Sequence, residues 1–376
     1  MRVVLAPDSF KESMSAAAAA AAMARGVRAV YPDAECVEVP MADGGEGTTE
    51  ALMDALNGLW RTVASTDALG RPLQAGYGLT ADGLAVIEVA AAVGIGLIEP
   101  GRRDILRSSS RGVADLLRDA LDRGATRAII GLGGTATSDG GAGMLAGLGA
   151  RWLDADGVTV EPWPEELVRL VRVDLTGLDP RLADLAIELA CDVINPLLGA
   201  SGAAAVFGPQ KGATPEQVPV LDDMLRRIAD ALVAAGRPDV RELAGAGAAG
   251  GLGAAFLSLG ATLRKGVEVV AEAAGLDAAI EGADLVLTGE GSLDRQTLAG
   301  KTPAGVAAVA ARHGVPVIAF AGRLGEGAEE LVGSGFVSVQ AIVRGPCDLA
   351  AALSDGPVNL ELAVASVLRV LRLGRF

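Results

Sequence analysis

Histidine and cysteine are scarce in this chain, and their scarcity excludes several kinds of site. The only histidine is His313, so a His-rich metal centre is excluded, and a Ser-His-Asp hydrolase would depend on that one residue. The three cysteines, Cys36, Cys191 and Cys347, are far apart and form no C-x-x-C pair. This argues against a zinc ribbon or a disulfide scaffold and is compatible with a reducing cytoplasm, where we expect the protein.

Positive charge and aromatic rings are also scarce. The formal net charge is −15, and the chain has six Phe, three Trp and two Tyr. A nucleic-acid-binding protein usually presents a basic face and stacking aromatic rings, so we expect no nucleic-acid partner. A site for anions would instead need a few Lys, Arg and backbone N–H groups placed locally against an acidic background.

Long uninterrupted hydrophobic runs are lacking as well. The first apolar run ends at Pro7 and Asp8, which makes it too short for the core of a signal peptide. A longer run at 84–98 is interrupted by Glu88 and two glycines. We therefore expect no transmembrane helix and no membrane partner.

Length and glycine are plentiful. A chain of 376 residues is long for one core, so two domains are expected. Most of the 51 glycines fall in short clusters between apolar runs, which indicates tight loops rather than a flexible linker.

Strands and helices alternate at both ends of the chain. The pattern predicts strands at 3–6, 35–39, 285–288, 315–319 and 337–343, with helices at 13–30, 48–56, 303–312 and 359–371. We expect a flavodoxin- or Rossmann-like α/β domain with a doubly wound parallel sheet, built from residues 1–60 and 283–376. Between them, 61–89 resembles antiparallel strands, and a second, mixed α/β domain is expected to be inserted at 61–282.

Four loops combine glycine with charged residues directly after an apparent strand. Open α/β sheets bind their ligands at such loops. They are Pro7–Ser13, Asp43–Thr48, Gly131–Gly141 and Thr288–Asp294, the last continuing to Gly300-Lys301-Thr302.

The fourth loop leads into a helix with Thr302 as a candidate cap and Pro303 in the first turn. Free N–H groups and Lys301 would suit a phosphate there. The loop is not a Walker A motif, because Arg295 stands where that pattern needs glycine. A capped helix with a solvated lysine is the alternative interpretation.

The third loop supports a competing function. Gly131-Leu-Gly-Gly-Thr-Ala136 matches a dinucleotide-binding fingerprint, and Asp154 lies at about the expected distance downstream. This pattern makes an NAD-dependent hydroxy-acid dehydrogenase the alternative. A single match of this kind is weak in a glycine-rich chain.

Several polar residues have two readings. Glu88 is either a buried, partnered carboxylate or a group that faces a ligand. Arg111 follows three serines at a helix start, where it either clamps a substrate carboxylate or is an ordinary surface arginine. Asp139 suits a turn about as well as a catalytic role, and His313 suits a helix end.

Taken together, the motif loops resemble the type I glycerate kinase family of bacteria. The matching stretches occur in the family's order and cover nearly the whole chain: APDSFKESMSA (6–16), PMADGGEGT (40–48), GLGGTATSDGGAGM (131–144), CDVINPLLG (191–199), FGPQKGAT (207–214), GAGAAGGLGAAF (245–256) and TGEGSLDRQTLAGKTPAGV (288–306). The resemblance implies ATP-dependent phosphorylation of D-glycerate, commonly at the 2-hydroxyl. It also implies an active site in the cleft between two α/β domains, and we expect a monomer or a homodimer.

Phosphoryl transfer needs Mg²⁺, positive charge around the moving group and a residue that orients the nucleophile. Lys11, Lys211 and Lys301 are the lysines within motif loops and are our candidates for contacting phosphates. The motif carboxylates available for Mg²⁺ or for the hydroxyl proton are Asp43, Asp192, Glu290 and Asp294.

We assign Asp192 as the base, with Lys11 and Asp43 in the catalytic group, and Glu290 and Asp294 as metal ligands. The remaining residues expected to bind substrate or nucleotide are Asp8, Ser9, Gly44, Gly45, Arg111, Gly133, Gly134, Thr135, Asp139, Lys211, Gly291, Ser292, Lys301 and Thr302.

Overall fold

The computed structural model describes residues 1–295, 297 and 301–373. The chain divides into two compact units. We call Met1–Asp43, Glu50–Asn57 and Val267–Phe376 the terminal unit, and Gly44–Thr49 with Gly58–Gly266 the central unit. Each unit has its own sheet and its own hydrophobic core.

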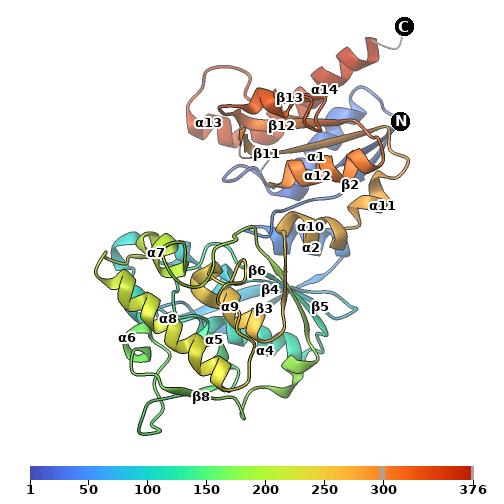
Figure 1. Cartoon of the computed structure of the whole chain (residues 1–376). Coiled ribbons are helices and arrows are strands. Elements are labelled where there is room, and N and C mark those ends of the chain that lie inside the picture. The colour runs from blue at the N-terminus through green and yellow to red at the C-terminus, as the bar shows by residue number, and fades with distance from the viewer. Residues whose placement is uncertain (296, 298–300, 374–376) are drawn as a thin grey trace. The chain divides into compact units, whose positions relative to one another are not determined.

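The terminal unit contains a five-stranded sheet in the order β13-β12-β11-β1-β2, with every neighbouring pair parallel (Figure 1). The two ends of the chain contribute two and three strands, as the sequence predicts. The strands are β1 (Arg2–Leu5), β2 (Glu35–Glu38), β11 (Leu285–Leu293), β12 (Val317–Leu324) and β13 (Ser338–Ala341).

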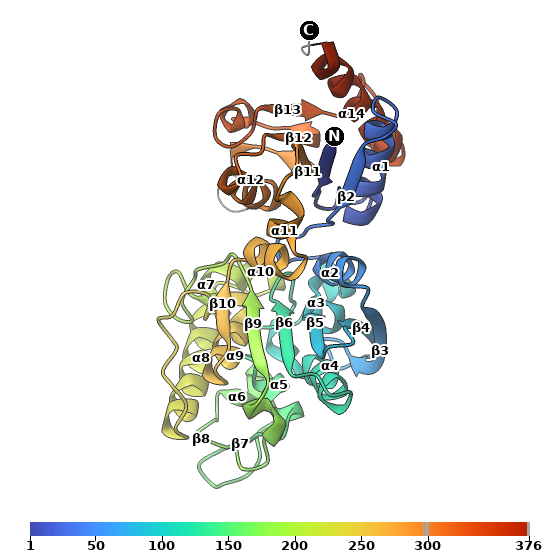
Figure 2. The ribbon, with the colours of Figure 1, turned by 90° about the vertical axis from the view of Figure 1, so that its right-hand side faces the viewer.

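Helices cover both faces of this sheet. α1 (Ala16–Arg28) packs against α14 (Gly356–Leu373) on one face, whereas α12 (Thr302–Arg312) lies on the other (Figure 2). The alanines of α1 allow this close packing, and the Ser15 hydroxyl caps the helix by accepting from the Ala18 N–H. The doubly wound class is therefore confirmed.

The order of the strands reverses between β1 and β11. From β1 the chain continues through α1 to β2 at one edge, and from β11 it continues through α12 to β12 on the other side. The loops that follow β1 and β11 therefore diverge at their carboxyl ends. In open α/β sheets such a switch point is where ligands bind.

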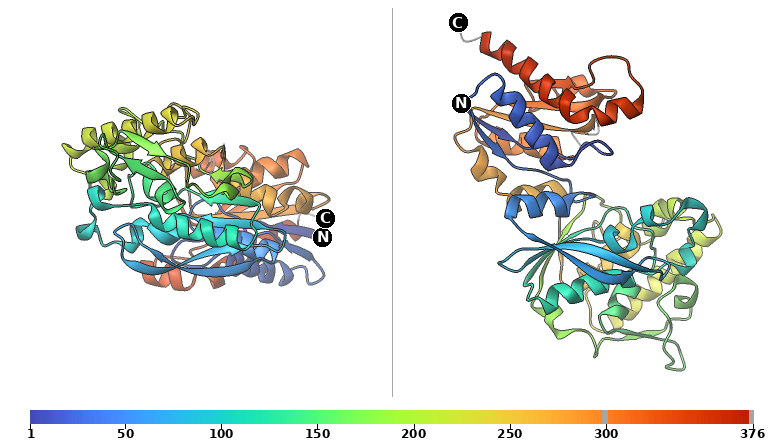
Figure 3. Two further views of the ribbon diagram at one scale, coloured as in Figure 1. Left: turned by 90° about the horizontal axis from the view of Figure 1, so that it is seen from below. Right: turned by 180° about the vertical axis from the view of Figure 1, so that it is seen from behind.

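The central unit contains a six-stranded sheet in the order β10-β9-β6-β5-β4-β3. β3, β4 and β5 are antiparallel neighbours, as expected for 61–89, while β5, β6, β9 and β10 run parallel. The long β3 and β4 strands are seen in light blue in the right-hand view of Figure 3. The strands are β3 (Leu59–Thr66), β4 (Pro72–Leu79), β5 (Leu84–Glu88), β6 (Arg127–Gly131), β9 (Ala186–Ala190) and β10 (Thr262–Arg264). A separate two-stranded antiparallel sheet is formed by β7 (Arg151–Leu153) and β8 (Arg172–Asp174).

The remaining helices connect these strands. In the central unit, α4 packs on β3, β4 and β5. The central unit also contains a long amphipathic helix, α8. The bounds are α2 (Thr48–Leu56), α3 (Ala90–Val93), α4 (Arg111–Asp122), α5 (Ala142–Gly147), α6 (Pro164–Leu167), α7 (Ala203–Phe207), α8 (Gln217–Ala234), α9 (Leu252–Ser258), α10 (Gly266–Ala273), α11 (Leu276–Ile280) and α13 (Leu349–Ser354).

The division between the units falls between Gly266 and Val267, rather than at 282–283. The reason is that α10 and α11 pack with the terminal unit: Val267 lies against Gly305 of α12, and α11 also contacts α12. In the same way, Gly44–Thr49 belongs with the central unit although its neighbours on both sides do not. Among the helices of the described residues, none combines the length and apolar character needed to cross a bilayer.

Shortening one buried leucine tests the core of the central unit. Leu116 on α4 is fully buried, so Leu116→Ala should lower the free energy of unfolding by about 2–5 kcal/mol. The matched control Leu243→Ala, at a leucine that is 50% exposed, should change it much less. Chemical denaturation measures both variants, and equal losses would contradict the described core.

Candidate active site

Motif carboxylates of the terminal unit meet at its switch point. Asp8 follows β1, and Glu290 lies on the carboxyl-terminal half of β11, the neighbouring strand. The Asp8 N–H donates to the Gly289 carbonyl at 2.8 Å, which fixes the start of the first motif loop beside the fourth. Both loops were singled out from the sequence, and the structure brings them together.

Asp8 is a nearly buried carboxylate with two protein donors. Its Oδ1 accepts from the Ser9 N–H at 2.6 Å, and its Oδ2 accepts from the Thr302 hydroxyl. Burial raises the pKa of Asp8 from 3.8 to about 6; the Thr302 hydrogen bond opposes the rise, and the negative charge of Asp43 adds to it. Thr302 opens α12 and is itself fully buried, so it secures Asp8 rather than presenting its own hydroxyl to solvent.

Glu290 is held by Thr297 and Lys301. The Thr297 hydroxyl donates to Glu290 Oε1 at 3.2 Å and accepts from the Asp294 N–H at 3.1 Å. Lys301 Nζ lies 3.7 Å from both Glu290 Oε1 and Asp294 Oδ1. Burial raises the pKa of Glu290 to about 7; Lys301 opposes the rise, and the charges of Asp8 and Asp43 add to it.

These mutually repelling carboxylates fit a divalent cation. Asp8, Asp43 and Glu290 each destabilise the charge of another member, and a cation would relieve this repulsion. No group of three or more His, Cys, Asp or Glu within the described part of the chain is arranged to hold a metal by itself. Mg²⁺ commonly takes only one or two protein carboxylates, with phosphates and water as its other ligands. The residues are therefore suited to a metal that arrives with a phosphate.

The other predicted residues of the terminal unit lie around the same edge. Ser9 contributes its N–H to Asp8, while Lys11 and Gly291 line an adjoining pocket. Ser292 continues β11 opposite Arg323 of β12. Gly300, part of the fourth motif, lies outside the described residues.

In the central unit, the Gly44–Thr49 loop lies over the carboxyl ends of the parallel strands. Gly44 has a φ of +87°, and a Cβ atom there would lie 2.9 Å from both the Ala190 side chain and the Gly266 backbone. Gly131, the last residue of β6, approaches the Gly44 carbonyl so closely that a Cβ would lie 2.6 Å from it. Glycine is required at both positions by this close approach of backbones.

Glu88 anchors that loop. At the end of β5, its Oε1 accepts from the Thr49 N–H at 2.8 Å, and the Gly47 backbone also supplies a hydrogen bond. Burial raises the pKa of Glu88, and these hydrogen bonds oppose the rise. Of the two readings from the sequence, the structure shows the partnered carboxylate.

Lys211 lies beneath the third motif loop. Gly133 and Gly134 are exposed, but Thr135 is buried and receives a hydrogen bond from Lys211 Nζ at 3.1 Å. The same ammonium donates to the Thr137 carbonyl at 2.7 Å. Burial lowers the pKa of Lys211 to about 7, opposed by the charge of Asp139. The lysine predicted to contact phosphate is thus turned toward the protein.

Asp139 is completely buried, and four protein donors surround its carboxylate. Oδ2 accepts from the Ser110 N–H, the Ser110 hydroxyl and the Gly143 N–H, and Oδ1 accepts from the Gly141 N–H. Burial raises its pKa, and these hydrogen bonds oppose the rise. This geometry favours the turn reading, in which Asp139 ties the loop to the start of α4.

Two further candidates are exposed. Asp192 follows β9, and its Oδ1 accepts from the Gly266 N–H at 3.2 Å. Arg111 begins α4 with an exposed side chain. Asp192 is therefore accessible at the same edge as the Gly44–Thr49 loop, because β9 and β6 are parallel neighbours.

Sequence reasoning missed several supporting residues. Thr297 bridges Asp294 and Glu290, Ser110 holds Asp139, and the buried Thr288 hydroxyl donates to the Ala6 carbonyl at 2.7 Å. Each lies in or next to a motif loop, but hydroxyls are common in loops, so the sequence alone gives no sign of their partners.

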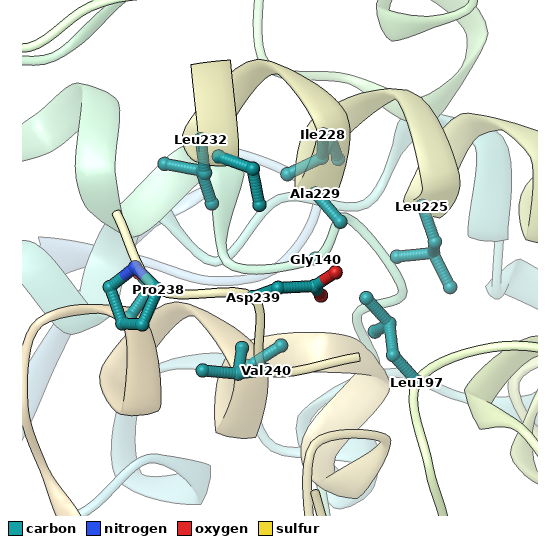
Figure 4. A pocket seen from close by; sticks show the side chains of 12 residues that line it. Gly140, Leu197, Leu225, Ile228, Ala229, Leu232, Pro238, Asp239 and Val240 are labelled. Carbon is teal, nitrogen blue, oxygen red and sulfur yellow. The ribbon is translucent and has the colours of Figure 1, made fainter. Parts of the chain in front are cut away.

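A small pocket beside Gly140 is lined by apolar side chains of α8, including Leu225 and Ile228 (Figure 4). Its volume of about 10 Å³ is too small for a substrate.

The surroundings of the dinucleotide fingerprint do not fit that function. A dinucleotide-binding loop passes directly into a helix, whereas α5 begins only at Ala142, after Ala136 has ended the fingerprint. Asp154 follows β7 of the separate two-stranded sheet, where its Oδ1 accepts from the Asp156 and Val158 N–H groups. It is a turn residue, away from the six-stranded sheet.

Comparison with known proteins gives consistent matches along the chain. The model of the "Glycerate kinase family" matches residues 3–372. A glycerate kinase from Bacillus subtilis (strain 168) is 44% identical, covering 100% of this chain and 99% of its own. A glycerate 2-kinase from Escherichia coli (strain K12) is 48% identical over 86% of each chain. A crystal structure from Salmonella typhimurium LT2, with a provisional glycerate kinase 2 assignment, has a TM-score of 0.92 and 46% identity, covering 100% of this chain and 99% of that one.

The raised pKa of Asp8 predicts that the ionised Asp8 carboxylate lowers the free energy of unfolding as the pH rises. Since the folded-state pKa of about 6 exceeds the usual 3.8, the contribution of Asp8 to stability is fully present below about pH 4 and is lost as the pH rises through 6. Asp8→Asn removes this titration. From pH 4 to pH 7, its free energy of unfolding should therefore gain about 1–3 kcal/mol relative to the parent. Denaturation across this range measures the gain, with the exposed Asp33→Asn as control. A pH-independent difference would contradict the described environment of Asp8.

Proposed function

The chain belongs to the glycerate kinase family, and from this premise we propose that it transfers the terminal phosphoryl group of ATP to D-glycerate, at the 2-hydroxyl rather than the 3-hydroxyl. The family match over residues 3–372 carries this proposal. The relative from Escherichia coli named glycerate 2-kinase supports the choice of hydroxyl.

Lys11, Lys301, Glu290 and Asp294 form the proposed phosphate side of the site. Glu290 and Asp294 would hold Mg²⁺ together with ATP oxygens; when bound, this ion neutralises charge on the phosphates. Lys301, which lies 3.7 Å from both carboxylates, balances their charge and is within reach of a phosphate at the same edge. The exposed Lys11 supplies a second cation after β1.

Asp192 is the proposed base. Its carboxylate is exposed and is oriented by the Gly266 N–H. Asp192 takes the proton of the glycerate hydroxyl as that oxygen forms a bond to the terminal phosphorus. The bond from this phosphorus to the bridging oxygen breaks, and ADP leaves with the electron pair.

Asp139 and Lys211 have a supporting role in this proposal. Their hydrogen bonds fix the loop that carries Gly133, Gly134 and Thr135, whose exposed glycine backbone can approach a ligand. The dehydrogenase alternative receives no support from the comparisons. An active site shared by the two domains, a monomeric or homodimeric state and a cytoplasmic location remain predictions.

Glycerate-dependent ADP release tests the reaction. With Mg-ATP, ADP should form with D-glycerate, and L-glycerate, tartronate and a reaction without acceptor serve as comparisons. Phosphorus NMR of the product should show the 2-phosphate. Folded protein that binds ATP but forms no ADP with glycerate would contradict the proposed acceptor, whereas stabilisation by NAD(H) and not by ATP would favour the dehydrogenase.

Removing the proposed base should affect turnover more than binding. Asp192→Asn should lower kcat about 100-fold or more and change the KM for glycerate much less, because general-base catalysis acts in the transition state. The control Asp223→Asn removes a carboxylate that pairs with Arg227 on α8 and should stay near parental activity. Near-normal turnover in Asp192→Asn would refute the assignment.

A further inference from the structure

A second feature of the terminal unit is a pocket of about 140 Å³ beside the carboxylates. Phe10, Ile342, Val343 and Leu353 supply apolar walls, and Lys11 and Arg323 supply the positive charge. Both of these side chains are exposed. The pocket therefore combines apolar walls with two exposed cationic side chains.

The walls are built by close approaches of the backbone. A Cβ atom on Gly322 would lie 2.8 Å from the Gly291 carbonyl, so glycine at 322 lets β12 pass close to β11 at this point. The Ser13 hydroxyl donates to the Leu353 carbonyl at 2.6 Å and ties α13 to the first motif loop. These contacts hold three separate segments around one space.

The pocket adjoins the carboxylate cluster through the chain itself. Phe10 and Lys11 follow Asp8 by two and three residues, and Gly291 directly follows Glu290 on β11. Adjacent Cα atoms are about 3.8 Å apart, so a ligand of modest length can occupy the pocket and reach the carboxylates at once.

We propose that this pocket receives the purine base of ATP, with Lys11 and Arg323 directed toward its phosphates. The inference rests on the proposed function and assigns its nucleotide subsite. Of the two reactants, only ATP has a flat, weakly polar ring that gains from apolar walls; glycerate is polar at every carbon. At about 140 Å³ the pocket is below the usual size for a whole ligand of about 300–1,000 Å³, which suits one ring with the phosphates outside.

Filling the pocket should block nucleotide binding. Ala352 lines the pocket from α13, and its neighbour Ala350 is exposed on the same helix and does not line it. Ala352→Phe should weaken Mg-ATP binding to the full chain at least about tenfold in calorimetry, whereas Ala350→Phe should bind like the parent.

Removing the pocket's arginine gives a second measurement that does not depend on packing. Arg323→Gln should raise the KM for ATP about tenfold and leave the KM for glycerate within about twofold, because its cation would contact only the nucleotide. The control Arg369→Gln removes an exposed arginine of α14. It should leave both constants unchanged.

The outcomes separate this inference from the proposed function. Parental ATP affinity in both Ala352→Phe and Arg323→Gln, or a rise confined to the KM for glycerate, would overturn the assignment of the pocket while glycerate-dependent turnover stands. If the parent protein binds ATP but does not phosphorylate glycerate, loss of that binding in Ala352→Phe would support the pocket and refute the acceptor.

Discussion

The pairing of β1 with β11 joins the two ends of the chain, and the placement of the carboxylates depends on it. Val3, Val4 and Leu5 pair in parallel with Leu285, Val286 and Leu287. Hydrogen bonds from the Ala6 and Asp8 N–H groups to β11 extend this alignment beyond the strand. A shift in this register would separate Asp8 from Glu290, so the position of the site is set by backbone pairing before any side chain contributes.

Hydrogen bonds from polar residues stabilise the two glycine-rich loops of the central unit. Glu88 fixes the Gly44–Thr49 loop, and Asp139 with Lys211 fixes the loop after β6. Glycine-rich loops lose much conformational entropy on ordering, and the hydrogen bonds to these charged groups offset part of that loss. The same loops leave Gly133 and Gly134 exposed, where a ligand can approach the backbone. Rigidity and access are thus provided by different residues of one segment.

Much of the fold could be predicted from the sequence, because alternating apolar runs and helix caps are local signals. The five strands of the terminal unit and the antiparallel start of the central unit were predicted in this way. The division at Gly266 could not be predicted, since it depends on which unit α10 packs against. β11 is also longer than its apolar core at 285–288, because Glu290 and Ser292 continue pairing with β12 despite their polarity.

The candidate site was only partly predictable, because the direction of each side chain depends on packing and not on local sequence signals. Motif loops identified Asp8, Glu290 and Lys301, and strand order brought them together. A lysine in a glycine-rich loop gives no local sign of the direction in which it points, and Lys211 points inward. Arg323 belongs to no motif loop. It lines the pocket beside the carboxylates because β12 pairs with β11.

The pairing of the chain's two ends also affects the order in which the protein can assemble during synthesis. Residues 58–266 leave the ribosome as one continuous stretch and hold nearly all of the central unit. β1 is made first, yet its neighbour β11 begins only at Leu285. Although domains generally fold from the N-terminus onward, here the earliest strand must wait for the last quarter of the chain, while the middle of the chain can fold before it. A nascent chain truncated before β11 therefore exposes the Val3–Leu5 edge, a surface that chaperones can bind.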